Sequence, residues 1–195
     1  MGILPKIIQR LTRLLGWRSR QLRGMGSIAP SAVVQRLMRV DGATNIHLGA
    51  NTIVQQGTWL AAVPLTGAKQ CRLEIRAGSV IGNMNHIYAT RSVIIEEEVL
   101  TADKVYISDC THSYTNTNIP VLRQPIVQLS NVVIGRGAWL GENVCVMGAC
   151  VGRGSVIGAN SVVTKDIPDY CVAVGAPARV IKRYNQTTKQ WEKIS

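Results

Sequence analysis

The sequence predicts an all-β fold, a left-handed parallel β-helix, from three observations: a six-residue repeat, an aliphatic composition and abundant glycine. Of the 195 residues 46% are hydrophobic, yet only 5% are aromatic and phenylalanine is absent. The 18 glycines are spread among valine, isoleucine, leucine and alanine residues. This composition favours a core of many thin, similar layers over one that is built around large rings.

The repeat has an aliphatic residue at its first position and a small residue at its fifth position. Hexads of this kind begin at Ile75, Ile81, Ile87, Ile95, Thr101 and Ile107, and again at Ile134, Leu140, Val151 and Ile157. Rougher hexads begin at Ile28 and Leu48. Val93 and Ile94 are two extra residues, and the segment from Val146 to Cys150 is one residue short.

A period of six matches neither an α-helix nor one continuous strand, so short strands joined by tight turns explain it. The first and fifth residues of each hexad are then expected to point inward. The glycine that follows the aliphatic residue is expected to adopt a positive φ at the corner. Three hexads close one triangular coil, and successive coils stack through parallel backbone hydrogen bonds. A sandwich with frequent Ile-Gly dipeptides is the alternative, which such a regular repeat disfavours.

The chain divides into three predicted parts. Residues 1–24 form a basic amphipathic helix, residues 25–168 form the left-handed β-helix with a loop at 113–131, and residues 169–195 form a C-terminal ligand-binding segment and tail. The net charge is +11, and residues 1–24 carry six basic residues and no acidic residue. Within residues 3–23 the aliphatic and basic residues have an amphipathic helical spacing. This helix would cap the open end of the β-helix or a neighbouring subunit, or would contact an anionic membrane.

The cysteines and the hydropathy pattern bear on the compartment. The five cysteines form no Cys-x-x-Cys pair and follow no signal peptide, which is typical of reduced thiols in a cytoplasmic protein. No apolar run approaches the ~18 residues of a transmembrane helix. A cytoplasmic protein, with contact to the inner face of the membrane through residues 3–23 as one option, is therefore expected.

Two segments near the end of the repeat carry a resemblance to a known family. Residues 154–168 (GSVIGANSVVTKDIP) and residues 175–181 (GAPARVI) resemble the C-terminal signature of the hexapeptide-repeat acyltransferases. Within that family the chain is most similar to sugar O-acetyltransferases, including galactoside, maltose and capsular polysaccharide enzymes. The resemblance implies an acetyl-CoA co-substrate, a sugar or glycan acceptor, a homotrimer, no metal and no nucleic acid.

His112 is the predicted catalytic base. It stands where the repeat breaks into a long loop, Ser113–Asn131, and such a loop is a functional candidate because a regular coil does not require it. The resemblance places the catalytic histidine of the family at this break. Transfer of an acetyl group from a thioester to a hydroxyl needs a base for the hydroxyl proton, and histidine suits neutral pH. A structural surface histidine is the alternative.

The last position of each hexad should point outward, and this position holds His86, His112 and Trp139. Counting hexads around the triangle places His112 above Ser92, Trp139 above Leu100 and His86 below Tyr106. These are three different faces, so the side chains converge only if subunits assemble around a threefold axis.

Two sets of binding residues are predicted. The acceptor contacts are Asn83, Asn85, His86, Asp109, Tyr114 and Trp139. A polar surface patch is the alternative for the first three, and a subunit contact is the alternative for Trp139. For acetyl-CoA, small residues would admit the pantetheine arm, and polar or basic residues would hold its far end and its phosphates. These cofactor-binding residues are Gly141, Ala159, Thr164, Lys165, Arg179 and Lys182. His47 is expected to be structural.

Two other functions remain open. β-Helix carbonic anhydrases hold zinc with three histidine ligands, and this chain has only three histidines, none at a close ligand spacing. A non-catalytic scaffold is the third option. Two departures from the family pattern are the short hexad 146–150 and Cys110, which stands where capsule-type relatives often have a second histidine.

Overall fold

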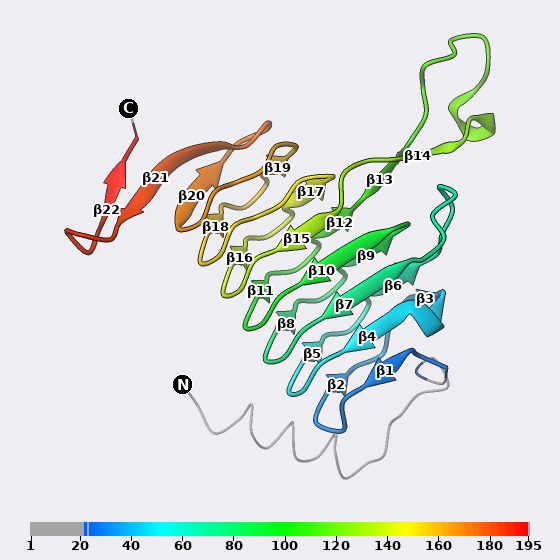
Figure 1. The fold of residues 1–195 in the computed structure, drawn as a ribbon, viewed down its shortest axis with the longest axis horizontal. Helices are drawn as coiled ribbons and strands as arrows, with labels where there is room; N and C mark the ends of the chain where they lie inside the picture. Colours follow the sequence, from blue (N-terminus) through cyan, green and yellow to red (C-terminus); the bar gives the residue numbers. More distant parts are fainter. Residues whose placement is uncertain (1–21, 23, 195) are drawn as a thin grey trace.

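The computed structural model describes Leu22 and residues 24–194, and most of the predicted hexads contribute one short strand to a parallel β-helix (Figure 1). The coil repeats as a triangle, so from β1 to β12 the strands that are three apart in the chain lie side by side. Over the described residues the strands form sheets of five, nine and six strands and one two-stranded sheet. The predicted fold class is confirmed.

Three of these sheets are the faces of the prism, and we name them sheets A, B and C. Sheet A consists, in spatial order, of β1 (Ser27–Ile28), β4 (Ile46–Leu48), β7 (Arg72–Ile75), β10 (Ser92–Ile95) and β15 (Val132–Ile134). Sheet B begins with β2 (Val33–Val34), β5 (Ile53–Val54), β8 (Val80–Ile81), β11 (Leu100–Thr101), β16 (Trp139–Leu140), β18 (Val156–Ile157) and β20 (Cys171–Val174). Sheet C consists of β3 (Arg39–Asp41), β6 (Trp59–Ala62), β9 (His86–Ala89), β12 (Tyr106–Ser108), β17 (Cys145–Met147) and β19 (Val162–Val163).

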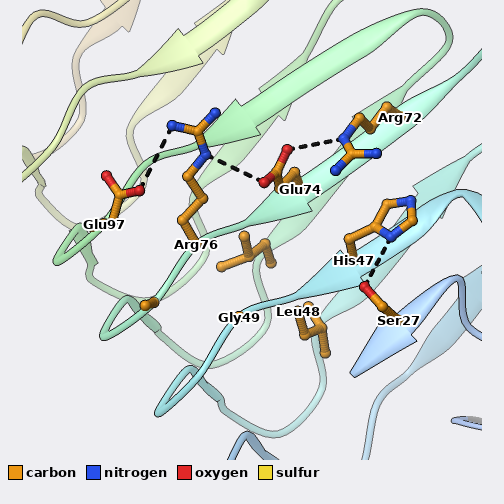
Figure 2. A pocket seen from close by; sticks show the side chains of 10 residues that line it. Ser27, His47, Leu48, Gly49, Arg72, Glu74, Arg76 and Glu97 are labelled. Carbon is orange, nitrogen blue, oxygen red and sulfur yellow. Dashed lines mark hydrogen bonds and ion pairs between the residues drawn. The ribbon is translucent and has the colours of Figure 1, made fainter. Parts of the chain in front are cut away.

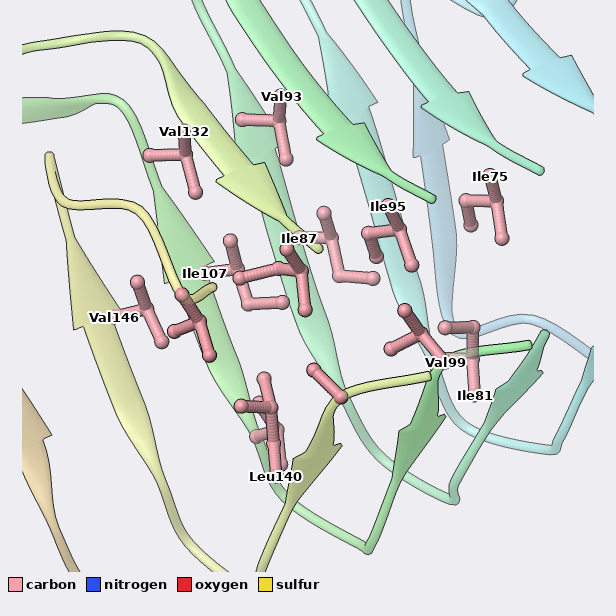
Figure 3. Packing of buried hydrophobic residues seen from close by; sticks show 14 of the residues in the cluster. Ile75, Ile81, Ile87, Val93, Ile95, Val99, Ile107, Val132, Leu140 and Val146 are labelled. Carbon is pink, nitrogen blue, oxygen red and sulfur yellow. The ribbon is translucent and has the colours of Figure 1, made fainter. Parts of the chain in front are cut away.

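Neighbouring strands on each face pair in parallel and in register, so equivalent side chains stack in rows along the prism axis. On sheet C the inward row includes Leu60, Ile87, Ile107 and Val146, all with no exposed surface. The rows of the three sheets meet in one narrow aliphatic core (Figure 3). The predicted inward position of the fifth residue is confirmed in most hexads, for example at Ser79, whereas Arg91 in the hexad from Ile87 is exposed.

Val93 and Ile94 are explained by the length of the sheet A strands. In β10, Val93 and Ile95 both point inward, and they pair with Leu73 and Ile75 of β7 below and with Val132 and Ile134 of β15 above. The sheet A strands of these coils are therefore all longer by two residues than the hexad pattern requires.

The expected positive φ at the glycine after the aliphatic residue is wrong. The positive φ falls two residues later, at Gly78 (+74°) and also at residues other than glycine, such as Glu98 (+61°). The earlier glycine is required for space instead. A Cβ on Gly141 would lie 2.8 Å from the backbone nitrogen of Ala159 in the next coil, closer than real Cβ contacts allow.

The prism edge between sheets C and A carries the departures from the repeat. The turn Gly42 to Asn45 with its 3₁₀ helix η2 (Ala43–Asn45), the loop 63–71 and the long insertion after β12 all lie there. The insertion forms an antiparallel hairpin of β13 (Cys110–His112) and β14 (Ile126–Gln128), with the 3₁₀ helix η3 (Val121–Arg123) near its tip. Figure 1 shows this hairpin extending away from the prism. We call residues 110–128 the hairpin.

The short segment from Val146 to Cys150 also turns at this edge, directly beside the returning hairpin. The Gly148 backbone N–H donates to the carbonyl of Ser108 (2.9 Å). A Cβ on Gly148 would collide with the Leu129 side chain. Ala149 still points inward, and Val151 still bridges Ile134 and Ile167, so the coil closes with one residue fewer.

The parallel stack continues to β20, which lies beyond residue 168, where the sequence placed the end of the β-helix. Sheet B is then extended by the antiparallel strands β21 (Arg179–Asn185) and β22 (Gln190–Lys193). The proposed N-terminal amphipathic helix over 3–23 lies outside the described residues, apart from Leu22. Within the described part of the chain no helix is long and apolar enough to cross a membrane.

Candidate functional site

His112 lies on the hairpin and not in the coil. It is the last residue of β13 and pairs with Ile126 of β14. The prediction that it stacks above Ser92 is wrong, because the chain leaves the coil after Asp109 and the strand above β10 is β15. His112 is exposed, and none of the described residues hydrogen-bonds to its ring. A histidine held in this way is accessible to a ligand and to a second subunit.

The hairpin beyond His112 is ordered by its own polar contacts. The Ser113 backbone N–H donates to the carbonyl of Pro125 (2.9 Å), which extends the ladder past β13. Gln124 Nε2 donates to the carbonyls of Asn116 (2.9 Å) and Ile119 (2.7 Å). Tyr114 is 73% exposed beside His112, so it remains available as an acceptor contact.

Asp109 cannot serve as the predicted acceptor contact, because its side chain is fully buried. Its carboxylate oxygens accept hydrogen bonds from the backbone N–H groups of Thr90, Arg91 and Ser92. Its proximity to His112 in the sequence suggested a ligand contact, whereas the side chain points into the corner of the coil below.

The two predicted asparagines are also committed to the coil. Asn85 is 1% exposed, and its Nδ2 donates to the carbonyl of Ala102 while its Oδ1 accepts from the Val105 backbone N–H. Asn83 Nδ2 donates to both carboxylate oxygens of Asp103 at 3.0 and 3.1 Å. Both asparagines join one coil to the next, which removes Asn85 from any acceptor site and leaves little of Asn83 for one.

His86 lies on the outer face of sheet C within an aromatic cluster that the sequence did not predict. It pairs with Tyr106 as expected and also with Trp59 of the rougher early repeat. The Trp59 and His86 rings stack at 4.0 Å with planes 7° apart, and Tyr88 and Tyr106 meet His86 edge-on at 5.8 and 5.1 Å. The sequence did contain a signal for this cluster, because Trp59, His86 and Tyr106 occupy equivalent positions of the repeat.

The aromatic cluster changes the chemistry of His86. Its Nε2 is buried and has no hydrogen-bond partner among the described residues. Burial lowers the pKa of His86, and the nearby Asp41 carboxylate opposes this effect only in part. A neutral imidazole in an aromatic stack is better suited to packing than to binding a hydrophilic acceptor, although its outer edge remains partly exposed.

Trp139 occupies the outer face of sheet B, where it lies above Leu100 as predicted. It is 48% exposed. The same outward row contains only aliphatic side chains below and above it, namely Val33, Ile53, Val80, Leu100, Val156 and Val172. A continuous apolar row of this kind on a monomer surface is typical of an interface with another protein surface.

The predicted cofactor residues lie in three places within one chain. Gly141 and Ala159 are stacked at the edge between sheets B and C, where Ala159 is exposed. Thr164 and Lys165 follow β19 and are exposed at the edge between sheets C and A, the edge that carries the hairpin. A ligand that contacts all of these residues in one chain would have to cross sheet C.

Arg179 and Lys182 share one face of β21 because of a β-bulge. Residues three apart in a regular strand point to opposite faces, but the register shifts so that Val174 pairs with Arg179 and Val172 with Lys182. Paired residues of an antiparallel ladder point to the same side, and Val172 and Val174 both point outward. The two cations therefore lie on the outer face of sheet B, in line with the row that contains Trp139.

An open pocket of about 330 Å³ lies elsewhere, on the outer face of sheet A (Figure 2). In it Ser27 Oγ lies 3.0 Å from His47 Nδ1, and Glu74 accepts from Arg72 (2.9 Å) and Arg76 (3.3 Å). Arg76 is also within 3.7 Å of the Glu96 and Glu97 carboxylates. The two guanidinium groups are thus matched by three carboxylates, which disfavours an anionic ligand here.

The thiols and histidines offer no alternative chemistry within one chain. Burial raises the pKa of Cys71 to about 11 and also raises the pKa of Cys110, so both favour the weakly nucleophilic protonated form. Among the described residues there is no group of three or more His, Cys, Asp or Glu side chains placed to hold a metal ion. His47, His86 and His112 lie on sheet A, sheet C and the hairpin.

Known proteins share the repeat and the fold. Residues 131–165 match the family model described as "Bacterial transferase hexapeptide (six repeats)". A putative lipopolysaccharide biosynthesis O-acetyl transferase of Escherichia coli (strain K12) is 45% identical over 116 residues, which cover 55% of this chain and 59% of that protein. A galactoside O-acetyltransferase of the same organism is 46% identical over 61 residues, 31% of this chain and 30% of that protein. The chain thus matches little more than half the length of these relatives, or less.

Solved structures extend the likeness over most of the chain. A maltose O-acetyltransferase from Clostridium difficile 630 superposes with a TM-score of 0.53 at 25% identity, over 93% of this chain and 86% of that one. The N-acyltransferase AntD from Bacillus cereus, in complex with dTDP and 3-hydroxybutyryl-CoA, superposes with a TM-score of 0.70 over 85% of this chain and 86% of that one. Its identity of 16% supports a common fold alone.

The repeat, the fold and these relatives show that the chain is similar to β-helical transferases. Residues 131–165 match the bacterial hexapeptide-repeat transferases, and the curated proteins that match part of the chain include two named as O-acetyltransferases.

Proposed function

We propose that the chain is an acetyl-CoA-dependent O-acetyltransferase that acts on a hydroxyl of a sugar or glycan, with His112 as general base. The observation that carries the proposal is the position of His112, an exposed histidine on a hairpin that departs from an otherwise regular coil. The O-acetyltransferase names of relatives at 45% and 46% identity support the reaction type. The acyl-CoA in a structural neighbour is in keeping with the co-substrate.

The reaction is a direct transfer. His112 takes the proton of the acceptor hydroxyl as the oxygen attacks the thioester carbonyl carbon. The new C–O bond forms, the C–S bond breaks, and the proton passes from His112 to the departing thiolate, which leaves as coenzyme A. No covalent enzyme intermediate is needed because the thioester is already activated, and the buried Cys110 thiol with its raised pKa is a poor nucleophile.

The binding groups support a site between chains. In one chain Gly141 and Ala159 lie on a different prism edge from the hairpin, and Trp139, Arg179 and Lys182 lie on the outer face of sheet B. A homotrimer that buries the apolar row containing Trp139 would bring these groups of one chain toward His112, Tyr114, Thr164 and Lys165 of the next. Arg179 and Lys182 would then hold phosphates, and Tyr114 and the partly exposed edge of His86 would contact the acceptor.

We place this activity in the cytoplasm, where the co-substrate and reduced thiols occur together. All five cysteines are free, as expected in a reducing compartment. Two roles stay open for residues 3–23: packing on the open end of the β-helix or on a neighbouring subunit, or contact with an anionic membrane, where a lipid-linked glycan would be presented.

The direct test is release of free coenzyme A from acetyl-CoA in the presence of a panel of acceptors. The panel should contain free sugars, nucleotide sugars, amino sugars and a lipid-linked glycan. We expect thiol release that depends on one acceptor class, yields an ester in the product, and is unchanged after dialysis against a chelator. One stoichiometric zinc per chain, with no thiol release on any acceptor, would favour the carbonic anhydrase alternative.

The assembly is tested separately by light scattering of the purified chain. We expect three copies, because a monomer would leave the row around Trp139 in water. Leu100→Glu places a charge in the middle of that row and should shift the mass toward a monomer. A stable wild-type monomer at micromolar concentration would rule out a site shared between chains.

A further inference from the structure

Asp109 is the residue at which the hairpin leaves the prism, and it is bound more tightly than any ordinary corner requires. Its carboxylate accepts four hydrogen bonds: from the backbone N–H of Thr90 (2.7 Å), Arg91 (2.7 Å) and Ser92 (2.7 Å), and from Thr90 Oγ1 (2.9 Å). A buried charge is tolerated only when such donors replace the lost water. Three of these donors belong to the turn after β9 and the fourth to Ser92, the first residue of β10, in the coil directly below.

The Asp109 backbone anchors the other strand of the hairpin. Its carbonyl accepts from Gln128 Nε2 (2.6 Å) and from the Leu129 backbone N–H (2.8 Å). One residue therefore fixes both the outgoing strand β13 and the returning strand β14 to the coil. Gln128 is the last residue of β14.

We call the place where β13 and β14 join the coil the root of the hairpin. Gln128 connects this root to a second loop. Its Oε1 accepts from Thr66 Oγ1 (2.5 Å), which belongs to the loop 63–71 at the same prism edge. It also lies 3.1 Å from Thr90 Oγ1, whose single proton it shares with the Asp109 carboxylate. The root of the hairpin is thus a closed polar network of Thr66, Thr90, Asp109 and Gln128. Such fully connected networks hold their members in one arrangement.

Other corners of the same prism show what a coil needs by itself. Glu96 Oε2 accepts one backbone N–H, that of Arg136 in the next coil (2.8 Å), and Asp166 Oδ1 accepts one, that of Cys150 (2.7 Å). Both are surface side chains, and one hydrogen bond to one N–H is sufficient there. Asp109 accepts three consecutive N–H groups from a fully buried position, at the one corner that is followed by His112.

We propose that Asp109 is a positioning residue for His112, and that Gln128 is the second tie of the same root. This inference rests on the proposed function, because it assigns the residues that hold the proposed base. Asp109 never contacts acceptor or acetyl-CoA in this scheme, and it acts only through the direction in which β13 leaves the coil.

The geometry makes the position of His112 sensitive to this root. His112 follows Asp109 by three residues of extended strand, a lever of ~10 Å. A rotation of about 6° at Asp109 moves His112 by ~1 Å, and a misplacement of this size costs ~10²-fold in rate. A rigid root is therefore needed to hold the His112 ring within reach of the acceptor hydroxyl proton.

The test compares Asp109→Asn with the wild type in the complete assembly. However the amide is oriented, its nitrogen faces two donors that lose their acceptor, so the root loosens. We expect kcat to fall by at least ~10-fold while KM for acetyl-CoA changes less than about twofold, since the interaction lost affects only the chemical step. Hydrogen exchange should rise in residues 110–128 and stay unchanged in the coils. Asp109→Glu keeps the negative charge but places the carboxylate one methylene farther from the backbone. We therefore expect kcat to stay below the wild-type value in this variant as well.

Two further variants keep the test decisive. Gln128→Ala removes the second tie and leaves the Asp109 carboxylate with all of its donors, so it reports on the root even if Asp109→Asn fails to fold. We expect a smaller fall in kcat in the same direction. Glu96→Gln, at a corner remote from the hairpin, should leave kcat and exchange in residues 110–128 unchanged.

The outcomes separate this inference from the proposed function. Normal kcat in Asp109→Asn or Gln128→Ala, despite faster exchange in the hairpin, would leave Asp109 a purely structural residue while acetyl transfer stands. A wild type that transfers acetyl groups to no acceptor overturns the proposed function, and the positioning role with it. A fall in kcat that Asp109→Glu fully restores would assign the effect to charge and not to position.

Discussion

Two edges of the prism are built from the same repeat but differ in the length and regularity of their turns. Between sheets A and B each coil turns within four residues, as at 76–79, 96–99 and 135–138. Between sheets C and A the turn contains a 3₁₀ helix in the first coil, the loop 63–71 in the second and the hairpin in the fourth. The first edge repeats and the second edge varies.

The difference shows where such a fold can tolerate additional chain. Stacking requires only that the strands below and above the insertion stay in register, and β10 and β15 still pair residue for residue although the hairpin separates them in sequence. An insertion at a corner therefore costs the core nothing, and loops on a rigid scaffold are where binding and catalysis gather. The variable edge, which carries His112, is accordingly the edge at which we propose the activity.

The largest expected effect comes from His112→Ala. The variant should fold, assemble and bind acetyl-CoA, because the ring contacts no described residue by a hydrogen bond. Turnover on the proper acceptor should fall by ~10²–10⁴-fold, the usual cost of removing a general base. Steady-state kinetics with thermal unfolding as the stability measurement checks this, with His47→Gln on sheet A as a matched control. If His112→Ala keeps near-normal turnover and His86→Ala loses it, the base is His86.

A second prediction compares the loss of stability caused by a substitution in the regular coil with that caused by a substitution in the hairpin. Ile81→Ala removes a fully buried side chain from the core and should lower the free energy of unfolding by about 2–5 kcal/mol. Leu122→Ala, at the hairpin tip where the side chain is 90% exposed, should change it by less than about 0.5 kcal/mol. Urea unfolding of both variants measures the difference. Equal losses would mean that the hairpin tip is buried in the assembly.

The repeat predicted the fold because its physics is local. Each hexad specifies one strand and one corner, and identical coils stack, so the inward residues Ile81, Ile87 and Ile107 could be named from spacing alone. The same spacing placed Trp139 above Leu100 and His86 beside Tyr106 correctly. Nothing beyond the period of six was required.

The site was harder because its residues lie where the period ends. Counting hexads placed His112 above Ser92, whereas the chain had already left the coil at Asp109. Asp109 and Asn85 were expected to meet the acceptor because they are polar and lie next to candidate residues. Polar residues in a β-helix, however, also satisfy the backbone N–H and C=O groups of neighbouring corners, and burial alone separates the two roles. Burial of a corner side chain depends on the coil stacked on it, which one hexad does not encode.

A third prediction concerns the cations that the β-bulge brings to one face. Arg179→Ala should weaken acetyl-CoA binding by about 1–3 kcal/mol, the cost of losing a charge-assisted contact to phosphate. Turnover at saturation should hardly change, because the contact is the same in the ground and transition states. Arg183→Ala is the matched control, since Arg183 pairs with the inward-facing Cys171 and so lies on the opposite side of β21. Equal losses in the two variants would point to general charge and not to a phosphate site.

The smallest effect is expected at His86, on the outer face of sheet C, and concerns the pH dependence of stability. Burial among Trp59, Tyr88 and Tyr106 lowers the pKa of His86 below its ordinary value of 6.5. The unfolded chain then binds a proton more readily than the folded chain, so the free energy of unfolding decreases as the pH falls below about 6.5 and is at its full value above it. His47, whose pKa is also lowered by burial and by Arg72, adds to this loss. Urea unfolding between pH 8 and pH 5 should show a weaker pH dependence in His86→Gln than in the wild type. If the two profiles coincide, the aromatic cluster does not hold His86 neutral, and a protonated His86 facing the acceptor becomes the better interpretation.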